Sequence, residues 1–505
     1  MKRLSAMILS LILIISLAAC GGTGEAGIPS GAEDNSTDET SGQLSLSGEI
    51  GGEITISAYD TMQYKAFLED AAKLFEENYP GTRVNVETFS AMPEIKTSGQ
   101  GDKKMVVAQI QDDPQGRQDY INKVNTALMS GEGADILAMD VLPIHQYADS
   151  GQLENLAAYM EADPQFSRAD YRENILDAIE YKNGTWFLPM DYTFDYYAYD
   201  STLLTGEAAS GFGTGSAFTS GELVALAEPA FDGSSRLFNT PHYQKGNGGG
   251  MWGNLLAENY TSFIDIQNRT ANFDDGSFAA LLETVKQYSE QGYIPKGSTG
   301  QKDAGEMIRQ PKEASADRFF FKPKNAFNLI SLFTRNLGMR MNVMAEGDTM
   351  AIGDDDEIAG IAAAADGSVP FTYEQAYGIN ANSQNKETAW AFLKFLLSEE
   401  MQLSTSLRPA ALPILNSARD KMMETRLTSM MEQQGQSLNE AQLEAIAGYN
   451  EAVEQLSDLI NAYILEDTVI NDMISAEVQF FFDGSKTAEE VANALQNKVS
   501  LYLNE

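Results

Sequence analysis

A strand–helix–strand pattern that begins near residue 53 constrains the fold more than any other feature of this sequence. Apolar residues alternate at Ile54, Ile56 and Ala58, as in a half-buried strand. Residues 64–75 then place their apolar side chains on one helical face, and period two returns over residues 83–89. Such a unit predicts a parallel sheet with a right-handed crossover, and therefore the α/β class.

The last hundred residues follow a helical pattern instead. Tyr449, Val453, Leu456 and Ile460 keep a period of about 3.6. Residues 487–490 read Thr-Ala-Glu-Glu, which predicts a capping box at the start of a further helix. We therefore expect a helical C-terminal region.

The first 52 residues have a different character. Lys2 and Arg3 precede an apolar run at 7–17, which is typical of a secretory signal peptide and too short for a transmembrane helix. The run ends in Leu-Ala-Ala-Cys at 17–20, which resembles a bacterial lipobox. That resemblance implies removal of residues 1–19 and lipidation of Cys20, with an ordinary signal peptide as the alternative. Residues 20–52 would then be the lipidated cysteine and a flexible linker, because residues 21–52 contain no aromatic or basic residue.

Charge and cysteine content exclude several classes of protein. The chain has 73 acidic and 34 basic residues and a formal net charge of −39, so we discount nucleic acid as a partner. One cysteine cannot form an internal disulfide bond, and two distant histidines make no local zinc motif. We predict no metal, no cofactor and no catalytic residue.

Residues 186–200 are unusually rich in aromatic and acidic side chains. Sugars present apolar faces and rims of hydroxyl groups, so a sugar site needs flat rings together with planar carboxylate, amide or guanidinium groups. This stretch supplies both, although a half-buried strand also favours Tyr and Phe. The aromatic residues are Trp186, Phe187, Tyr192, Phe194, Tyr196, Tyr197 and Tyr199, and the acidic ones are Asp191, Asp195 and Asp200.

The order of segments resembles family 1 extracellular solute-binding proteins, the receptors of ATP-driven sugar importers related to maltose-binding protein. Five stretches carry the resemblance: 54–80, 129–136 with 151–153 downstream, 188–204, 377–380 and 388–396. It implies an α/β, two-lobed periplasmic-binding-protein fold (type II) with hinge strands between the lobes. The implied lobes are 53–195 plus 374–410 and 196–373 plus 411–505, with crossings near 194–199, 373–380 and 408–415. The segments 100–116 and 418–442 look longer than the corresponding segments of the family.

The resemblance also implies a function and a place in the cell. The chain would bind a carbohydrate, expected to be an oligosaccharide, between its lobes and deliver it to the transmembrane subunits of an ABC transporter. It would act as a monomer, held by lipid on the outer face of the cytoplasmic membrane. Two alternatives stay open: a receptor for peptides or other small solutes, and an exported glycoside hydrolase.

We expect the ligand to contact residues that directly follow strands, because ligands of open α/β sheets bind beyond the carboxyl ends of strands. Trp252 joins the candidates because it follows a glycine-rich approach and resembles an inner-face aromatic residue of the family, although a core tryptophan is an equal alternative. Arg408 lies where the last interlobe loop of the family passes the cleft. The candidate ligand-binding residues are Tyr59, Asp60, Asp140, Asp191, Tyr192, Tyr196, Trp252 and Arg408.

Overall fold

The computed structural model describes residues 44–60, 64–90, 94–98, 105–109, 114–243, 249–295, 318–337, 355–404, 411–433 and 435–504. Cys20 and Arg408 lie outside these residues, and so does the side chain of Asp60. In the part of the chain that is described, no helix combines the length and apolar character that a membrane span requires.

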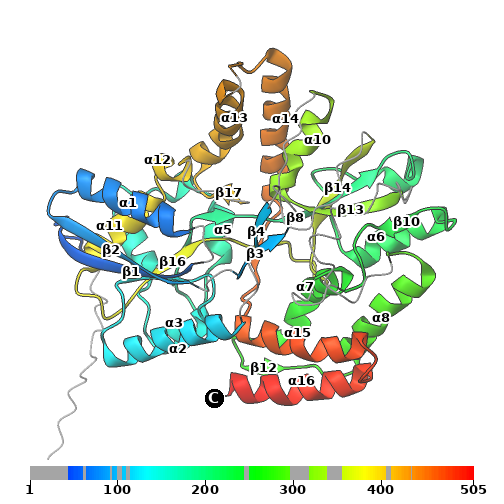
Figure 1. The fold of residues 1–505 in the computed structure, drawn as a ribbon, viewed down its shortest axis with the longest axis horizontal. Helices are drawn as coiled ribbons and strands as arrows, with labels where there is room; N and C mark the ends of the chain where they lie inside the picture. Colours follow the sequence, from blue (N-terminus) through cyan, green and yellow to red (C-terminus); the bar gives the residue numbers. More distant parts are fainter. Residues whose placement is uncertain are drawn as a thin grey trace, which may run out of the picture. The chain divides into compact units, whose positions relative to one another are not determined.

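The first sheet contains the predicted strand–helix–strand unit (Figure 1). Helix α1 (Tyr64–Asn78) connects the parallel strands β1 and β2 and buries one apolar face, with Phe67 and Phe75 among its core residues. Strand β16 enters antiparallel to β5 from more than 200 residues further along the chain. The strands in spatial order are β2 (Thr82–Ser90), β1 (Gly52–Asp60), β5 (Ile136–Ala138), β16 (Ala376–Ile379) and β6 (Leu188–Pro189).

The second sheet is organised around a central aromatic strand. β8 pairs antiparallel with both β13 and β14. Its successive side chains point to opposite faces of the sheet, and the two faces belong to different cores. Tyr196 and Ala198 belong to the first hydrophobic core, whereas Tyr197 and Tyr199 belong to the second. The strands in spatial order are β10 (Arg236–Phe238), β13 (Phe319–Asn325), β8 (Asp195–Asp200), β14 (Asp356–Ala362) and β9 (Ala217–Phe218).

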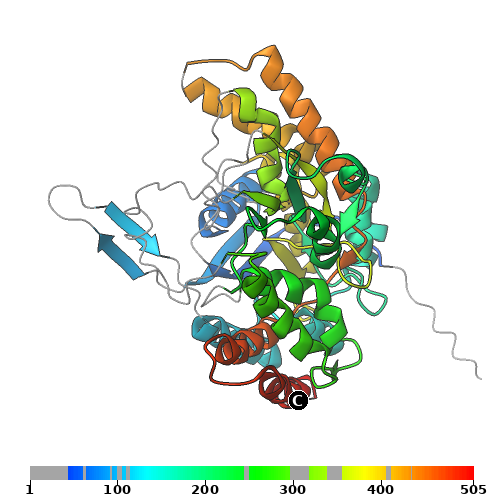
Figure 2. The ribbon, with the colours of Figure 1, turned by 90° about the vertical axis from the view of Figure 1, so that its right-hand side faces the viewer.

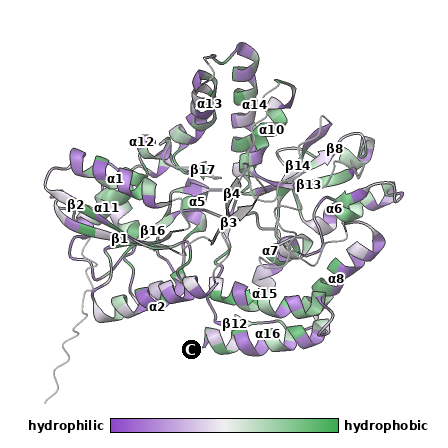
Figure 3. Ribbon diagram, in the orientation of Figure 1, coloured by the Kyte–Doolittle hydropathy of each residue, from purple (hydrophilic) through white to green (hydrophobic). Residues whose placement is uncertain are grey.

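Helices supply the remaining walls of the two cores. Those with buried residues in the first core are α1, α2 (Pro114–Ser130), α3 (Ile144–Asp149), α4 (Leu156–Ala162), α5 (Glu173–Ala178), α10 (Ile330–Thr334), α11 (Lys386–Leu396), α12 (Glu399–Gln402), α13 (Asn416–Gln433) and α14 (Glu440–Ser457). Those of the second core are α6 (Ser220–Ala227), α7 (Met251–Phe263), α8 (Ser277–Gln291), α15 (Thr468–Phe482) and α16 (Ala488–Leu503). The predicted capping box of α16 is present, and Figure 3 shows hydrophobic and hydrophilic positions alternating along this helix.

Short paired strands complete the structure. They are β3 (Glu94–Ser98) with β4 (Met105–Gln109), β7 (Asp191–Tyr192) with β17 (Leu412–Pro413), β11 (Ile264–Asp265) with β12 (Thr270–Ala271), and β15 (Pro370–Phe371) with β18 (Ala462–Tyr463). Part of the long segment 100–116 thus forms a strand of the β3–β4 ribbon.

Three extended segments connect the two cores side by side. β15 pairs with β18, and Thr193 forms a bridge to Thr372 directly beside them. The last passage between the cores therefore lies between Ile460, in the first core, and Ile470, in the second. A crossing between the lobes was expected near 408–415. From residue 411 onward, where the chain is described, the structure shows no crossing, because Leu412 and Pro413 pair with β7 beside the first core. The lobe boundaries drawn from the sequence remain a prediction.

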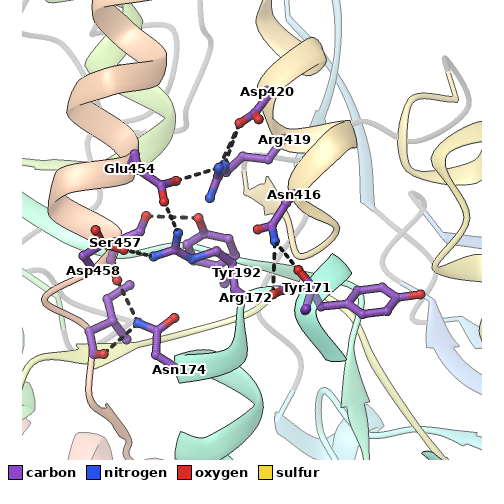
Figure 4. A network of polar contacts seen from close by, with 12 residues as sticks. Tyr171, Arg172, Asn174, Tyr192, Asn416, Arg419, Asp420, Glu454, Ser457 and Asp458 are labelled. Atoms are coloured by element: carbon purple, nitrogen blue, oxygen red, sulfur yellow. Dashed lines mark hydrogen bonds and ion pairs between the residues drawn. The ribbon is translucent and has the colours of Figure 1, made fainter. Parts of the chain in front are cut away.

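Helices α13 and α14, which contain residues 418–433 and 440–442 of the long segment, are seen from the side in Figure 2. A polar network fixes the two helices (Figure 4). The buried Arg172 contacts Glu454 of α14 at 2.9 Å and Asp458 at 2.8 Å. Arg419 of α13 reaches Glu454 at 2.6 Å, so one carboxylate joins both guanidinium groups. The network holds the helical pair against the first core, next to the crossing segments.

Candidate functional site

A cavity of about 350 Å³ lies where the three crossing segments meet. The first sheet contributes Asp140, which follows β5, and the second contributes Asp195 and Tyr196 of β8. Helix α7 adds Asn254 and Glu258 from the second core. The walls thus come from both halves of the structure, as in a cleft between two lobes.

Aromatic rings form much of the cavity wall. Tyr373 and Tyr463 stack with ring centroids 5.6 Å apart, and the hydroxyl of Tyr463 donates to that of Tyr373 at 3.1 Å. Burial raises the pKa of Tyr373 well above its usual value, so this phenol stays protonated at neutral pH. The ring-bearing residues of the wall are Phe194, Tyr196, Tyr197, Phe371, Tyr373 and Tyr463.

Four carboxylates share the cavity with these rings. Glu258 is almost completely buried and accepts hydrogen bonds from the backbone N–H of Ser220 at 2.9 Å and from the hydroxyl of Tyr197 at 3.0 Å. Glu466 accepts from the side-chain amide of Asn471 at 2.7 Å. Burial raises the pKa of Glu258 and of Glu466 above their usual values. The fourth carboxylate belongs to Asp140.

Asp195 differs from the other three. Its side chain is accessible to the cavity, yet surrounding protein desolvates it enough to raise the pKa of its carboxyl to about 6. Among the described residues, no hydrogen bond or ion pair involves this carboxylate. It therefore faces the cavity with its acceptor sites unused.

Two of the predicted ligand-binding residues, Asp140 and Tyr196, line the cavity. Tyr59 is instead buried in the first core, where it packs against Phe89 and Tyr120. Trp252 is completely buried in the second core and meets Phe278 edge to face at 5.4 Å. Neither side chain lines the cavity, because each occupies the core face of its element.

Asp191 and Tyr192 lie close to the crossing segments but point away from the cavity. Oδ1 of Asp191 accepts from the backbone N–H of Glu374 at 2.7 Å and of Gln375 at 3.4 Å. The hydroxyl of Tyr192 is 3.0 Å from Oγ of Ser457 on α14. Both side chains hold neighbouring segments together rather than facing a ligand.

Sequence reasoning missed the contribution of helix α7. It singled out Trp252, but Asn254, about half a turn later, and Glu258, less than two turns later, line the cavity. Gly250 caps this helix with φ 89°, where a Cβ atom would lie 2.6 Å from the carbonyl oxygen of Pro241. The available signal was Glu258 itself, a carboxylate inside an otherwise mostly apolar helical face.

The arrangement suits binding of an organic molecule. In the described part of the chain, no three His, Cys, Asp or Glu side chains are placed to hold a metal ion. Rings, carboxylates, two amides and three threonines line one space, a combination that matches a ligand with apolar faces and hydroxyl groups.

Solved structures share this fold at low sequence identity. The extracellular solute-binding protein family 1 from Alicyclobacillus acidocaldarius is 14% identical with a TM-score of 0.53, covering 90% of this chain and 100% of that chain. The sugar-binding protein MalE from Xanthomonas citri is 15% identical with a TM-score of 0.53, covering 90% and 98%. The GacH receptor of Streptomyces glaucescens, described unliganded and in complex with acarbose, is 15% identical with a TM-score of 0.50, covering 90% and 100%.

The predicted two-lobed α/β fold is confirmed by these structures. A comparison with curated proteins found no match to the sequence. The family model for bacterial extracellular solute-binding proteins, however, matches residues 103–425, which is more than half of the chain. The chain therefore belongs to the bacterial extracellular solute-binding proteins.

Proposed function

We propose that this protein captures a carbohydrate in the cavity between its lobes and delivers it to the membrane subunits of an ABC transporter. The observation that carries the proposal is the cavity wall, in which six aromatic residues alternate with carboxylate, amide and hydroxyl groups. Rings pack against the apolar faces of a sugar, and the polar groups accept or donate hydrogen bonds at its rim. The structurally similar MalE is a sugar-binding protein and the GacH receptor is described in complex with acarbose, which supports the same ligand class.

Binding would act through closure of the lobes. Three extended segments connect the cores, and each of them contributes residues to the cavity. A ligand that contacts both halves binds the closed form more tightly and shifts the open–closed equilibrium toward it. The transporter would then recognise the closed form. No bond of the ligand is made or broken in this cycle.

A thermal-shift screen followed by calorimetric titration tests the proposal. A carbohydrate present at 100 times its dissociation constant adds about 2.7 kcal/mol to the free energy of unfolding. Neutral, basic and acidic oligosaccharides of two to seven sugars form the screen, with peptides as the comparison set. Stabilisation by peptides alone would contradict the carbohydrate assignment, and hydrolysis of a bound sugar would indicate the glycoside hydrolase instead.

Tyr373→Ala should weaken binding of the sugar identified in that screen about tenfold. The substitution removes a ring face worth about 1.3 kcal/mol of apolar contact. Tyr373→Phe is the matched control, since it keeps the ring and loses only the hydroxyl that accepts from Tyr463. Titration calorimetry compares the three proteins, and equal affinity of Tyr373→Ala and the wild type would remove this ring from the site.

We also propose that a lipid on Cys20 holds the protein at the membrane, on the basis of the lipobox-like tetrad and the polar linker behind it. Cys20→Ala should move the protein from the membrane fraction to the soluble fraction without changing its melting temperature. Cell fractionation with a high-salt wash measures the change. Retention of the variant in the washed membranes would refute the anchor.

A further inference from the structure

The cavity is acidic on every side for which the structure describes a wall. Asp140 follows β5, Asp195 begins β8, Glu258 belongs to α7, and Glu466 lies just before α15. The described lining residues include no Lys, Arg or His. Four carboxylates thus line one cavity, and the residues described in its wall supply no basic side chain.

Three buried carboxylates elsewhere in this protein have basic partners, whereas the buried Asp191 is held by backbone N–H groups. Asp356 lies 2.6 Å from Nζ of Lys322, Asp163 lies 2.5 Å from Nζ of Lys394, and Glu477 contacts Lys486 at 2.6 Å. The pairing is expected, because a desolvated charge is costly unless an opposite charge accompanies it. The described wall of the cavity differs from these pairs, because it brings together four carboxylates and no Lys, Arg or His side chain.

Asp195 is the clearest case, since its carboxylate lines the cavity and makes no hydrogen bond or ion pair with the described residues. A positively charged group on the ligand would give this carboxylate the cationic partner that the described residues do not provide. The aromatic wall favours the same ligand, because the faces of Tyr and Phe rings attract ammonium groups. A metal ion is a poor match, since the described carboxylates do not converge on one point.

We infer that the cavity selects a carbohydrate that carries at least one protonated amine, such as an oligosaccharide of glucosamine, over neutral and acidic sugars. This inference rests on the proposed carbohydrate function and adds the charge of the ligand to it. The ammonium group would lie beside Asp195, with the sugar rings against Tyr373 and Tyr463. An acidic sugar would place its carboxylate among four others and would be repelled.

Titration calorimetry with probes of matched length tests the inference. The probes are the trisaccharide of glucosamine, its fully N-acetylated form, maltotriose and an oligomer of three uronic acids, at a pH at which the amines are protonated. Spermidine serves as a cation without a sugar ring. We expect the glucosamine trisaccharide to bind at least about tenfold more tightly than its acetylated form, because a hydrogen bond to a charged group is stronger than a neutral one.

Asp195→Asn should remove most of that preference. The variant keeps the size of the side chain and loses no hydrogen bond among the described residues, so its fold should be preserved. It should bind the glucosamine trisaccharide about 10- to 100-fold more weakly, a clearly larger loss than for the acetylated form, so that the preference falls. Glu466→Gln provides a second variant of the wall. Glu180→Gln, an exposed carboxylate outside the cavity lining, is the matched control and should change neither affinity.

The outcomes separate this inference from the function on which it rests. Equal or tighter binding of the acetylated or neutral trisaccharide would overturn the charge selection and leave carbohydrate binding intact. Binding of spermidine with no binding of any sugar would overturn the carbohydrate function and uphold selection of a cation. Failure of both cationic probes to bind would overturn the inference, and so would an unchanged preference in both Asp195→Asn and Glu466→Gln.

Discussion

Lys322→Met is expected to lower the free energy of unfolding by about 3–5 kcal/mol, the usual cost of removing one partner from a buried ion pair. Nζ of Lys322 lies 2.7 and 2.6 Å from the two carboxylate oxygens of Asp356. The side chains are only 10% and 1% exposed, so water cannot replace the missing ammonium group. Denaturant unfolding followed by circular dichroism measures the loss.

Two further variants distinguish an ion-pair effect from general damage to the sheet. Replacing both partners, as Lys322→Met with Asp356→Leu, should recover much of the lost stability, because no buried charge is left without its partner. Lys286→Met removes an exposed partner of Glu283 at 3.8 Å and should cost less than about 1 kcal/mol. If Lys286→Met destabilises the protein as much as Lys322→Met does, burial of the pair is not the cause.

Asp191→Asn is expected to stabilise the protein progressively, relative to the wild type, as the pH rises from about 4 to 8. Burial raises the pKa of Asp191 to about 8 in the folded protein, whereas the unfolded chain has the ordinary value near 4. Between these values the folded state binds the additional proton, so the wild type loses stability with rising pH. The Asn variant has no such proton to lose. At about 1.4 kcal/mol per unit of pKa difference, the relative gain is on the order of 5 kcal/mol at pH 8.

Denaturant unfolding of both proteins at pH 5 and at pH 8 isolates this contribution, because the other carboxyl groups are common to them. Asp232→Asn is the control of opposite sign. Hydrogen bonds from Ser234 lower the pKa of the exposed Asp232, so its contribution to stability is present above the unfolded pKa and is lost in acid. A relative stability of Asp191→Asn that does not change between pH 5 and 8 would contradict the raised pKa.

The fold was predictable where the signal is local. The alternation at Ile54, Ile56 and Ala58 and the capping box at Thr487 each depend on a few neighbouring residues, and both are confirmed. The crossing after Ile460 was not predictable from such signals, because it depends on helices α13 and α14 packing into the first core. The position of these two helices depends on contacts such as that between Arg172 and Glu454, two residues that are far apart in the sequence.

The cavity was predictable only in part for the same reason. Asp140 and Tyr196 could be named because they follow or begin a strand. Phe371 and Tyr463 could not, since their place in the wall comes from the pairing of two strands of two residues each. Trp252 was predicted to bind ligand but does not line the cavity. Its helix borders the cavity, while the tryptophan side chain is buried in the second core.

The second core also determines when this protein can finish folding. It combines residues 197–294 with the last two helices, and Val491, Leu495 and Val499 of α16 are completely buried in it. A chain growing from its N-terminus therefore leaves the apolar surface of residues 197–294 uncovered until α16 has been synthesised. The second core therefore cannot be completed before α13 and α14 of the first core have been synthesised, although most of its own residues precede those helices in the sequence.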